Sequence, residues 1–456
     1  MTSDLSRRQF GKLLAGTGAA AAFTQLGRTA ALATPVSGYK AMVGVFLFGG
    51  NDGWNMVVPN DSRYTGYASS RGAAIALAPS SLTPLTGSPF SLNSALAPLQ
   101  AIWNDGGMNV VLNTGTLYQP LTKTIYQNNP LLRPVNLMSH ADEQAHWQGL
   151  RPRDINADGF MGRLNDRIPQ SSIPSLISLG GANLILLGGT NSPLVLPSTG
   201  SMVKYGASDN PANPAVFKRN SAASAFADGS TYGTITDSTA TAISSGYAQS
   251  ITANTILTSG SSSVDQYFVD SNNRALSSDV ARQLLRVARM IEARSTLSQP
   301  RQTFFVSQGG YDTHAGQKGA QAGLYADLSA ALVAFYNAMK GLGLSENVTT
   351  FTMSDFGRVF KSNDQGGTDH AWGNNHLVIG GALRPQTIHG TYPSTVLGGV
   401  DDVLGDGRFI PTIAQEEYIG AIAKWHGVAD ADLPYVFPNW ATWSSNGRGP
   451  LPMFQS

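Results

Sequence analysis

The apolar run at 42–48, which ends at Gly49 and Gly50, constrains the fold of this chain more than any other segment. A strand with one face in water alternates apolar and polar side chains, so an unbroken apolar run indicates a strand buried on both faces. Such strands are typical of parallel sheets, because helices cover both faces of those sheets. We therefore expect a central parallel strand here, followed by a sharp turn at the two glycines.

Helical and strand-like segments alternate along much of the remaining chain. Capping residues and the helical spacing of apolar side chains predict helices at 93–106, 280–291 and 324–339. Apolar runs predict strands at 108–112, 303–306 and 348–352. This order predicts an α/β fold with a mostly parallel sheet and helices on both faces.

Glycine and proline are frequent, with 50 and 24 residues, which indicates many turns and loop-rich insertions. Residues 60–92 carry turn residues and little periodicity. The segment 198–263 is dominated by Ser, Ala, Thr and Gly, and we expect it to be a surface insertion. No clean linker divides the chain, so residues 34–456 are expected to form one domain.

The first 33 residues are typical of a twin-arginine export signal. Arg7, Arg8 and Phe10 precede an apolar stretch at 13–26, and small residues at 31–33 suit a signal peptidase. The stretch is too short to anchor the chain stably in a bilayer. We expect the twin-arginine machinery to export the folded chain to the periplasm or beyond, a route that favours proteins loaded with an ion or cofactor beforehand.

Composition narrows the chemistry and the partners. The chain has no cysteine, so disulfides and thiolate metal sites are excluded. The net charge is +1 and no basic block follows the signal, so the sequence gives no electrostatic case for nucleic acid or a membrane surface. Small molecules or neutral polymers are the expected partners.

Four glycine-containing segments that follow predicted strands carry the candidate functional side chains. Ligands of open parallel sheets bind beyond the carboxyl ends of the strands, so we expect these segments to meet. Without thiols, carboxylates and neutral imidazoles are the ligands left for Zn, Mn, Mg or Ca, and one or two ions are expected. Taken singly, each Asp is also a common turn former and each His a common surface residue. The candidate metal ligands are Asp52, Asp312, His314, Asp355, Asp369, His370 and His376.

The motifs in these segments resemble a known family. Phe-Gly-Gly-Asn-Asp-Gly, Gly-Tyr-Asp-Thr-His, Ser-Asp-Phe-Gly-Arg and Gly-Thr-Asp-His-Ala-Trp-Gly-Asn-Asn-His, with the twin-arginine start and a Ser-His pair at 139–140, carry the resemblance. They are similar to those of an exported bacterial family, domain-of-unknown-function family 1501. That family is similar to the alkaline phosphatase, sulfatase and phosphoglycerate mutase superfamily, whose members use two metals around a Ser, Thr or modified Cys nucleophile.

The resemblance implies roles for particular residues. Asp52 resembles the first metal-binding Asp of the superfamily, and Ser139, with Gly149 ten residues on, resembles its nucleophile. A serine at a helix start also feels the positive end of the helix dipole, which favours an alkoxide, although a simple helix cap is the alternative.

Other positions match the superfamily pattern less closely. Asp312 and His314 resemble the Asp and His of one metal site at a shorter spacing. Phe356 follows Asp355 where a histidine is expected, so His370 or His376 would have to complete a second site. Arg163 and Arg358 are candidates for binding an anionic oxygen, and ordinary surface arginines are the alternative.

Two functions from different classes follow. The first is an exported metal-dependent hydrolase of phosphate or related sulfate esters, acting on a small-molecule or polymer substrate with a Ser nucleophile. The second is a non-catalytic metal-containing protein that binds a surface glycan or a partner protein on the same fold. Ser139 favours the first, and Phe356 favours the second.

Overall fold

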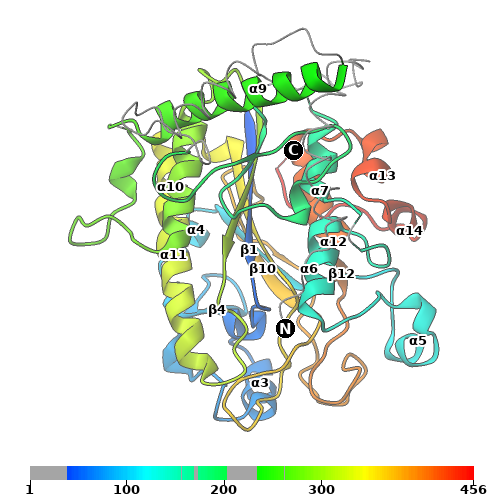
Figure 1. Cartoon of the computed structure of the whole chain (residues 1–456). Coiled ribbons are helices and arrows are strands. Elements are labelled where there is room, and N and C mark those ends of the chain that lie inside the picture. Colours follow the sequence, from blue (N-terminus) through cyan, green and yellow to red (C-terminus); the bar gives the residue numbers. More distant parts are fainter. Residues whose placement is uncertain (1–37, 156, 169–172, 203–233, 261, 456) are drawn as a thin grey trace.

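The structure is a computed structural model that describes the chain except for residues 1–37, 156, 169–172, 203–233, 261 and 456 (Figure 1). The predicted export signal at 1–33 therefore lies outside the described residues. Within the described part of the chain, no helix is both long enough and apolar enough to cross a membrane.

A nine-stranded sheet forms the centre of the molecule. Its strands lie in the order β11-β5-β10-β9-β1-β8-β6-β7, and β12 also pairs with β5. All pairings are parallel except those of β10, which runs antiparallel to β5 and β9. The strands are β1 (Lys40–Leu47), β5 (Met108–Gly115), β6 (Leu176–Ser178), β7 (Leu194–Val195), β8 (Arg301–Gln308), β9 (Val348–Ser354), β10 (Asn374–Ile379), β11 (Ile388–His389) and β12 (Ile413–Ala414). The predicted mostly parallel sheet is confirmed.

Strand β1 has buried side chains on both of its faces, as its apolar run predicts. Val43 and Val45 belong to one core cluster, which also contains side chains of α10 and α11. Met42 and Phe46 belong to a second cluster, which contains side chains of α6, α7 and α12. Helices thus cover both faces of the sheet (Figure 1).

The helices of the two layers differ in length. The longest in the first layer is α11, and its apolar stripe confirms the predicted helix at 324–339. The α-helices are α2 (Gly53–Met56), α3 (Arg63–Arg71), α4 (Leu99–Asn104), α5 (Lys123–Asn128), α6 (His140–Gly149), α7 (Phe160–Asn165), α9 (Thr234–Leu257), α10 (Asp279–Glu292), α11 (Gln317–Gly341), α12 (Gln415–His426), α13 (Leu433–Val436) and α14 (Trp440–Ser445).

The region from 57 to 106 contains more structure than its sequence suggests. A second, three-stranded antiparallel sheet is formed by β2 (Val57–Pro59), β3 (Leu82–Pro84) and β4 (Phe90–Asn93). The single helix expected at 93–106 is a 3-10 turn at Ser94–Leu96 followed by α4. Asn93 caps the turn by accepting a hydrogen bond from the backbone N–H of Ala95 at 3.0 Å. Pro98 separates the two pieces, because proline has no N–H for an unbroken helix.

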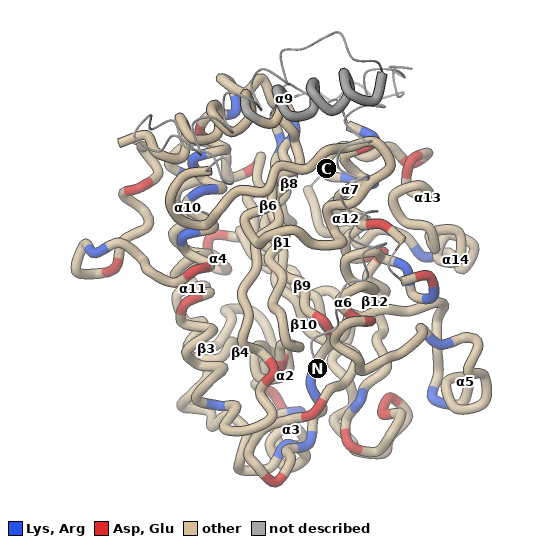
Figure 2. The backbone as a smooth tube through the Cα atoms, in the orientation of Figure 1, with Lys and Arg blue, Asp and Glu red and all other residues tan. Residues whose placement is uncertain are grey.

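Charged residues are few and mixed in sign. Figure 2 shows Lys and Arg interspersed with Asp and Glu along the described backbone. Neither sign gathers over one face in this view, which agrees with the net charge of +1.

Candidate metal centre

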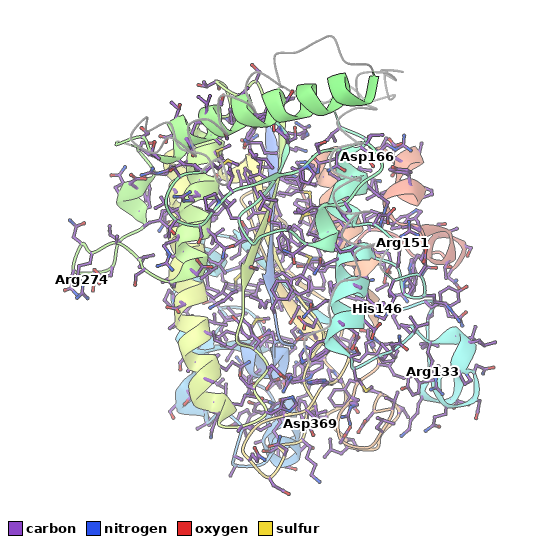
Figure 3. All side chains as sticks on the ribbon, in the orientation of Figure 1. Arg133, His146, Arg151, Asp166, Arg274 and Asp369 are labelled. Carbon is purple, nitrogen blue, oxygen red and sulfur yellow. The ribbon has the colours of Figure 1, made fainter. Side chains whose placement is uncertain are left out.

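The ends of several strands meet at one edge of the sheet. Leu47, the last residue of β1, lies opposite both Gln308 of β8 and Ser354 of β9. Because β10 runs the other way, its beginning lies at the same edge. The single loop that joins β9 to β10 also folds back on itself, through an isolated antiparallel bridge between Arg358 and His370. The sheet therefore brings together the segments that the sequence singled out, and Figure 3 shows Asp369 beyond this edge.

Three imidazole rings converge on one carboxylate oxygen at this edge. The Nε2 atoms of His314, His370 and His140 lie 3.0, 3.4 and 3.5 Å from Oδ1 of Asp312. The Nε2 atoms of His314 and His370 lie 3.0 Å apart. We call His140, Asp312, His314 and His370 the Asp312 cluster.

Each imidazole ring of the Asp312 cluster is oriented by a hydrogen bond at its Nδ1 atom, on the side away from Asp312. The acceptors are the Asp355 carboxylate for His140 at 2.8 Å, the Asp369 carboxylate for His314 at 3.1 Å, and the Met138 carbonyl for His370 at 2.9 Å. A carboxylate or carbonyl at Nδ1 holds the proton there, so the Nε2 lone pair faces the cluster. This is the arrangement by which histidine ligands of metals are usually oriented.

The Asp312 cluster fits a divalent ion. The Nε2 atom of His140 is buried and has no hydrogen-bond partner among the described residues. Two Nε2 lone pairs facing each other repel unless a proton or a cation lies between them. Ligands about 2.0–2.1 Å from a tetrahedral ion lie roughly 3.3 Å from one another. The distances from Asp312 Oδ1 to the three Nε2 atoms, and from His314 Nε2 to His370 Nε2, are close to this value, at 3.0–3.5 Å. The ligand atoms of His140, Asp312 and His370 all lie within 4.8 Å of one another.

Arg358 borders the Asp312 cluster and forms an ion pair with the Asp312 carboxylate. Its side chain is buried, and Nη1 donates to Asp312 Oδ1 at 2.8 Å and to the Gly49 carbonyl at 3.2 Å. Burial tends to raise the pKa of Asp312, but Arg358 and the neighbouring histidines outweigh it and hold this pKa below its ordinary value. Nε and Nη2 of Arg358 bond to Thr368. All three nitrogens of the Arg358 guanidinium therefore donate to acceptors of the protein.

Asp355 and Phe356 support the rings of the Asp312 cluster. Oδ2 of the buried Asp355 accepts from Gln144 at 2.8 Å as well as from His140, and Oδ1 accepts from the Gly49 N–H at 3.1 Å. The Phe356 ring lies 4.8 Å from the His140 ring and 4.7 Å from the His370 ring. A Cβ on Gly50 would stand 2.2 Å from Phe356, and the φ of Gly50 is +82°, so this turn requires glycine.

Ser139 lies at the start of α6, directly before His140. It is the N-cap residue, yet its side chain makes no capping hydrogen bond. Met138 before it has a φ of +70°, a conformation that non-glycine residues rarely adopt, and its N–H donates to the Glu143 carboxylate at 2.6 Å. The predicted nucleophile thus adjoins the cluster, with its hydroxyl not used as a cap.

Asp52 and Arg163, which were also predicted as site residues, do not contact the Asp312 cluster directly. Asp52 is buried in an ion pair with Arg71. Arg163 is buried and bonds to Asp158 and to the carbonyls of Gly149 and Val436. Because Gly149 ends α6 and His140 begins it, Arg163 lies a helix length away from the cluster.

His376, also predicted as a ligand, lies in the core within β10. Its ring stacks on Tyr418, meets Trp147 edge to face, and lies 3.4 Å from the Thr352 hydroxyl. The ring therefore faces the α6 and α12 layer rather than the Asp312 cluster.

Burial of His376 predicts a pH-dependent stability. Burial lowers its pKa to about 3, so the unfolded chain, with a histidine pKa of about 6.5, takes up the proton first. The folded state therefore loses stability as the pH falls below about 6.5, by about 2 kcal/mol for this residue between pH 7 and 5. Urea unfolding at the two pH values should show a loss smaller by that amount in His376→Asn. An identical loss in both proteins would contradict this account.

His140 is the functional candidate that reasoning from sequence missed. It belongs to the Ser-His pair at 139–140 but is not among the ligands that the sequence predicts. Its place directly after the candidate nucleophile was the available signal. What the sequence could not show is that α6 presents this ring to Asp312.

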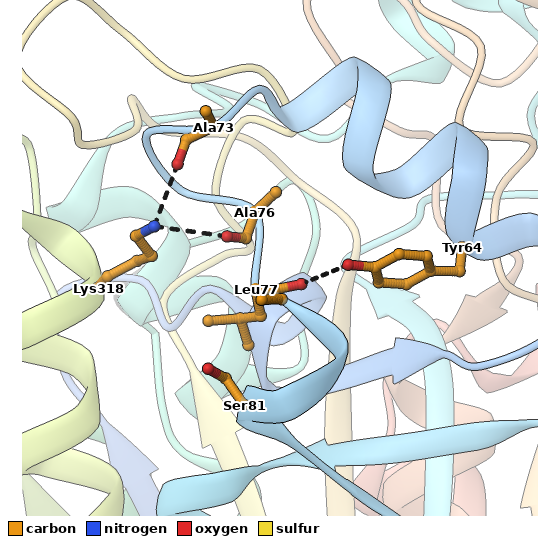
Figure 4. Close-up of a pocket in the computed structure, with 7 residues that line it drawn as sticks. Tyr64, Ala73, Ala76, Leu77, Ser81 and Lys318 are labelled. Carbon is orange, nitrogen blue, oxygen red and sulfur yellow. Dashed lines mark hydrogen bonds between the residues drawn. The ribbon is translucent and has the colours of Figure 1, made fainter.

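A small cavity lies elsewhere, beside the start of α11. It has a volume of about 320 Å³, and none of its lining residues belongs to the Asp312 cluster (Figure 4). Lys318 Nζ donates to the carbonyls of Ala73 at 3.1 Å and Ala76 at 3.5 Å across it. The lining residues are Tyr64, Ala73, Ala76, Leu77, Ala78, Ser81 and Lys318.

Comparison with known families supports the predicted resemblance. Residues 248–415 match the model of the family described as "Protein of unknown function (DUF1501)". The matched span includes Asp312, His314, Asp355 and His370, whereas Ser139 and His140 precede it. The resemblance is confirmed over these residues. No curated protein matches the chain.

Solved structures similar to the chain cover most of it at low identity. They include Ps i-CgsB in complex with k-i-k-neocarrahexaose, with 9% identity and a TM-score of 0.39 over 91% of this chain and 78% of that chain. A protein in the alkaline phosphatase superfamily from Vibrio parahaemolyticus has 12% identity and a TM-score of 0.30 over 85% and 73%. A phosphonate monoester hydrolase from Silicibacter pomeroyi has 7% identity and a TM-score of 0.35 over 91% and 78%.

Proposed function

We propose that this chain is an exported, metal-dependent hydrolase of phosphate or related sulfate esters, with Ser139 as its nucleophile. The observation that carries the proposal is the convergence of three Nε2 atoms on Asp312 Oδ1, with every Nδ1 atom held by an acceptor. Side chains oriented in this way are built to bind a cation. The substrate is a small-molecule or polymer ester in the periplasm or outside the cell.

The residues around the Asp312 cluster suit ester hydrolysis. Ser139 lies at the positive end of the α6 dipole, which favours the alkoxide form of its hydroxyl and a negatively charged group beside it. The Asp312 cluster would hold a divalent ion, and such an ion would supply positive charge to polarise the ester and stabilise the leaving oxygen. Arg358 holds the Asp312 carboxylate in its ionised form, ready to act as a ligand. Gln144 and Asp355 fix the His140 ring beside the nucleophile.

A second candidate function is a non-catalytic protein that binds a surface glycan or a protein partner through the same centre. The Phe356 ring favours it, because this ring stands against His140 and His370 where the superfamily pattern has a metal-binding histidine. In addition, the described residues contain one group of three or more potential ligands close enough to hold an ion. The superfamily pattern has two metals, so a single ion also favours this second function.

Chelation tests the proposed function directly. The mature protein is expected to release its ion to a chelator, to lose turnover of phosphomonoester, phosphodiester or sulfate ester chromogens, and to recover it when Zn²⁺ or Mn²⁺ is returned. The measurement is initial rate beside metal content by mass spectrometry at each stage.

The two functions give different results in this experiment. An ion that binds reversibly without turnover of any ester class would favour the binding protein. Turnover that persists in metal-free protein would contradict a metal-dependent hydrolase.

A further inference from the structure

The carboxylate of Asp52 is bound by hydrogen-bond donors of the protein. It follows the turn at Gly49 and Gly50, its side chain is fully buried, and its Oδ1 atom caps α2 by accepting from the Trp54 N–H at 3.1 Å. Its Oδ2 atom accepts from Arg71 and Gln317. Both carboxylate oxygens therefore already have protein donors.

Arg71 provides a buried positive charge at this carboxylate. It is the last residue of α3, its side chain is fully buried, and its guanidinium lies 5.0 Å from the Phe360 ring and 5.7 Å from the Tyr67 ring. Its Nε and Nη1 atoms have no hydrogen-bond partner among the described residues. Burial raises the pKa of Asp52, while Arg71 and Gln317 act in the opposite direction. A neutral Asp52 would leave the buried guanidinium without a counter-charge, so we treat the pair as ionised.

A buried hydrogen-bond path joins this ion pair to the Asp312 cluster. Gln317 donates to Asp52 and accepts from the Thr368 hydroxyl, which in turn accepts from Arg358 Nε at 3.2 Å. Arg358 then donates to Asp312. Arg71 thus stands at the far end of a network that reaches the cluster.

The residues that would bind a second metal ion are not free to do so. Asp52 is engaged by Arg71, Asp355 by His140, Gln144 and Gly49, and an aromatic ring stands at Phe356. We infer that the cation bound by Asp52 is the guanidinium of Arg71, so that the site holds one divalent ion rather than two. The count of one ion rests on the proposed function, whereas the pairing of Asp52 with Arg71 does not.

A double-mutant cycle on the mature chain tests the pairing. Asp52→Asn keeps a capping side chain but leaves Arg71 without its counter-charge, and Arg71→Met keeps the volume but leaves Asp52 unpaired. Each is expected to lower the unfolding temperature by about 3–6 °C. The double variant should recover at least half of the summed loss, both as purified and in chelator.

The exposed pair Asp61 and Arg63 provides a matched control cycle. Its charged atoms lie 2.8 Å apart, but the side chains are 39% and 36% exposed. The same substitutions there should show no measurable coupling.

Metal content separates this inference from the proposed function. One ion per chain, in the wild type and in Asp52→Asn alike, supports the inference. Two ions in the wild type that fall to one in Asp52→Asn, or no coupling in the cycle, would overturn it. Strong coupling in a chain that binds no ion would support the pairing of Asp52 with Arg71 while refuting the proposed metal centre.

Discussion

Replacing Asp312 by asparagine is expected to weaken binding of the divalent ion by at least about 100-fold. Loss of a residue that only orients a ligand commonly costs 10–100-fold in affinity, and Asp312 is the carboxylate on which all three imidazoles converge. The substitution removes the negative charge but keeps the size of the side chain. Competition against a fluorescent chelator measures the affinity.

Asp105→Asn is the control for this prediction. Asp105 is similarly exposed, at 42% against 46% for Asp312, and also pairs with a cation, Lys340, at 2.7 Å. It precedes β5 and therefore lies at the opposite edge of the sheet. Affinity should be unchanged in Asp105→Asn. Equal affinity in Asp312→Asn and the wild type would rule out Asp312 as a ligand.

Replacing Ser139 by alanine is expected to reduce ester turnover by roughly 10³-fold or more while the ion remains bound. Removing a nucleophile abolishes the covalent step, whereas the four side chains of the Asp312 cluster are untouched. The rate and the metal content should be measured on the same sample, because only a selective loss of rate identifies a nucleophile.

Ser278→Ala distinguishes a nucleophile from a helix cap. Ser278 begins α10 as Ser139 begins α6, is also half-buried, and likewise makes no side-chain capping bond. The two substitutions should change the unfolding temperature by similar small amounts, and only Ser139→Ala should lose turnover. Full activity in Ser139→Ala would remove this residue from the chemistry.

The central sheet was predictable because its signals are local. The apolar run of β1 and the stripes of α10 and α11 each lie within one segment, and burial on both faces follows from that pattern. The small sheet of β2, β3 and β4 was not predictable, because strands of three or four residues are too short to show a period. The interruption at Pro98 could have been anticipated from its missing N–H.

The site was predictable in its location more than in its detailed contacts. Parallel strands with aligned ends place Asp312 and Asp355 at one edge whatever their side chains do. His370 reaches the same edge because β10, which follows it, runs antiparallel to β9. The pairing of Asp52 with Arg71 depends on how α3 packs, which no local pattern encodes. For His376 the sequence gives only its place in a histidine-rich segment, and the register of β10 sends its ring into the core.

The most direct test of the central claim is an anomalous difference map from crystals of the protein grown with Zn²⁺ or Mn²⁺. We expect one strong peak about 2 Å from Asp312 Oδ1 and from the Nε2 atoms of His140, His314 and His370. A map with no peak among these four side chains, or with its peak at another group of residues, would contradict the claim that this edge of the sheet is a metal centre.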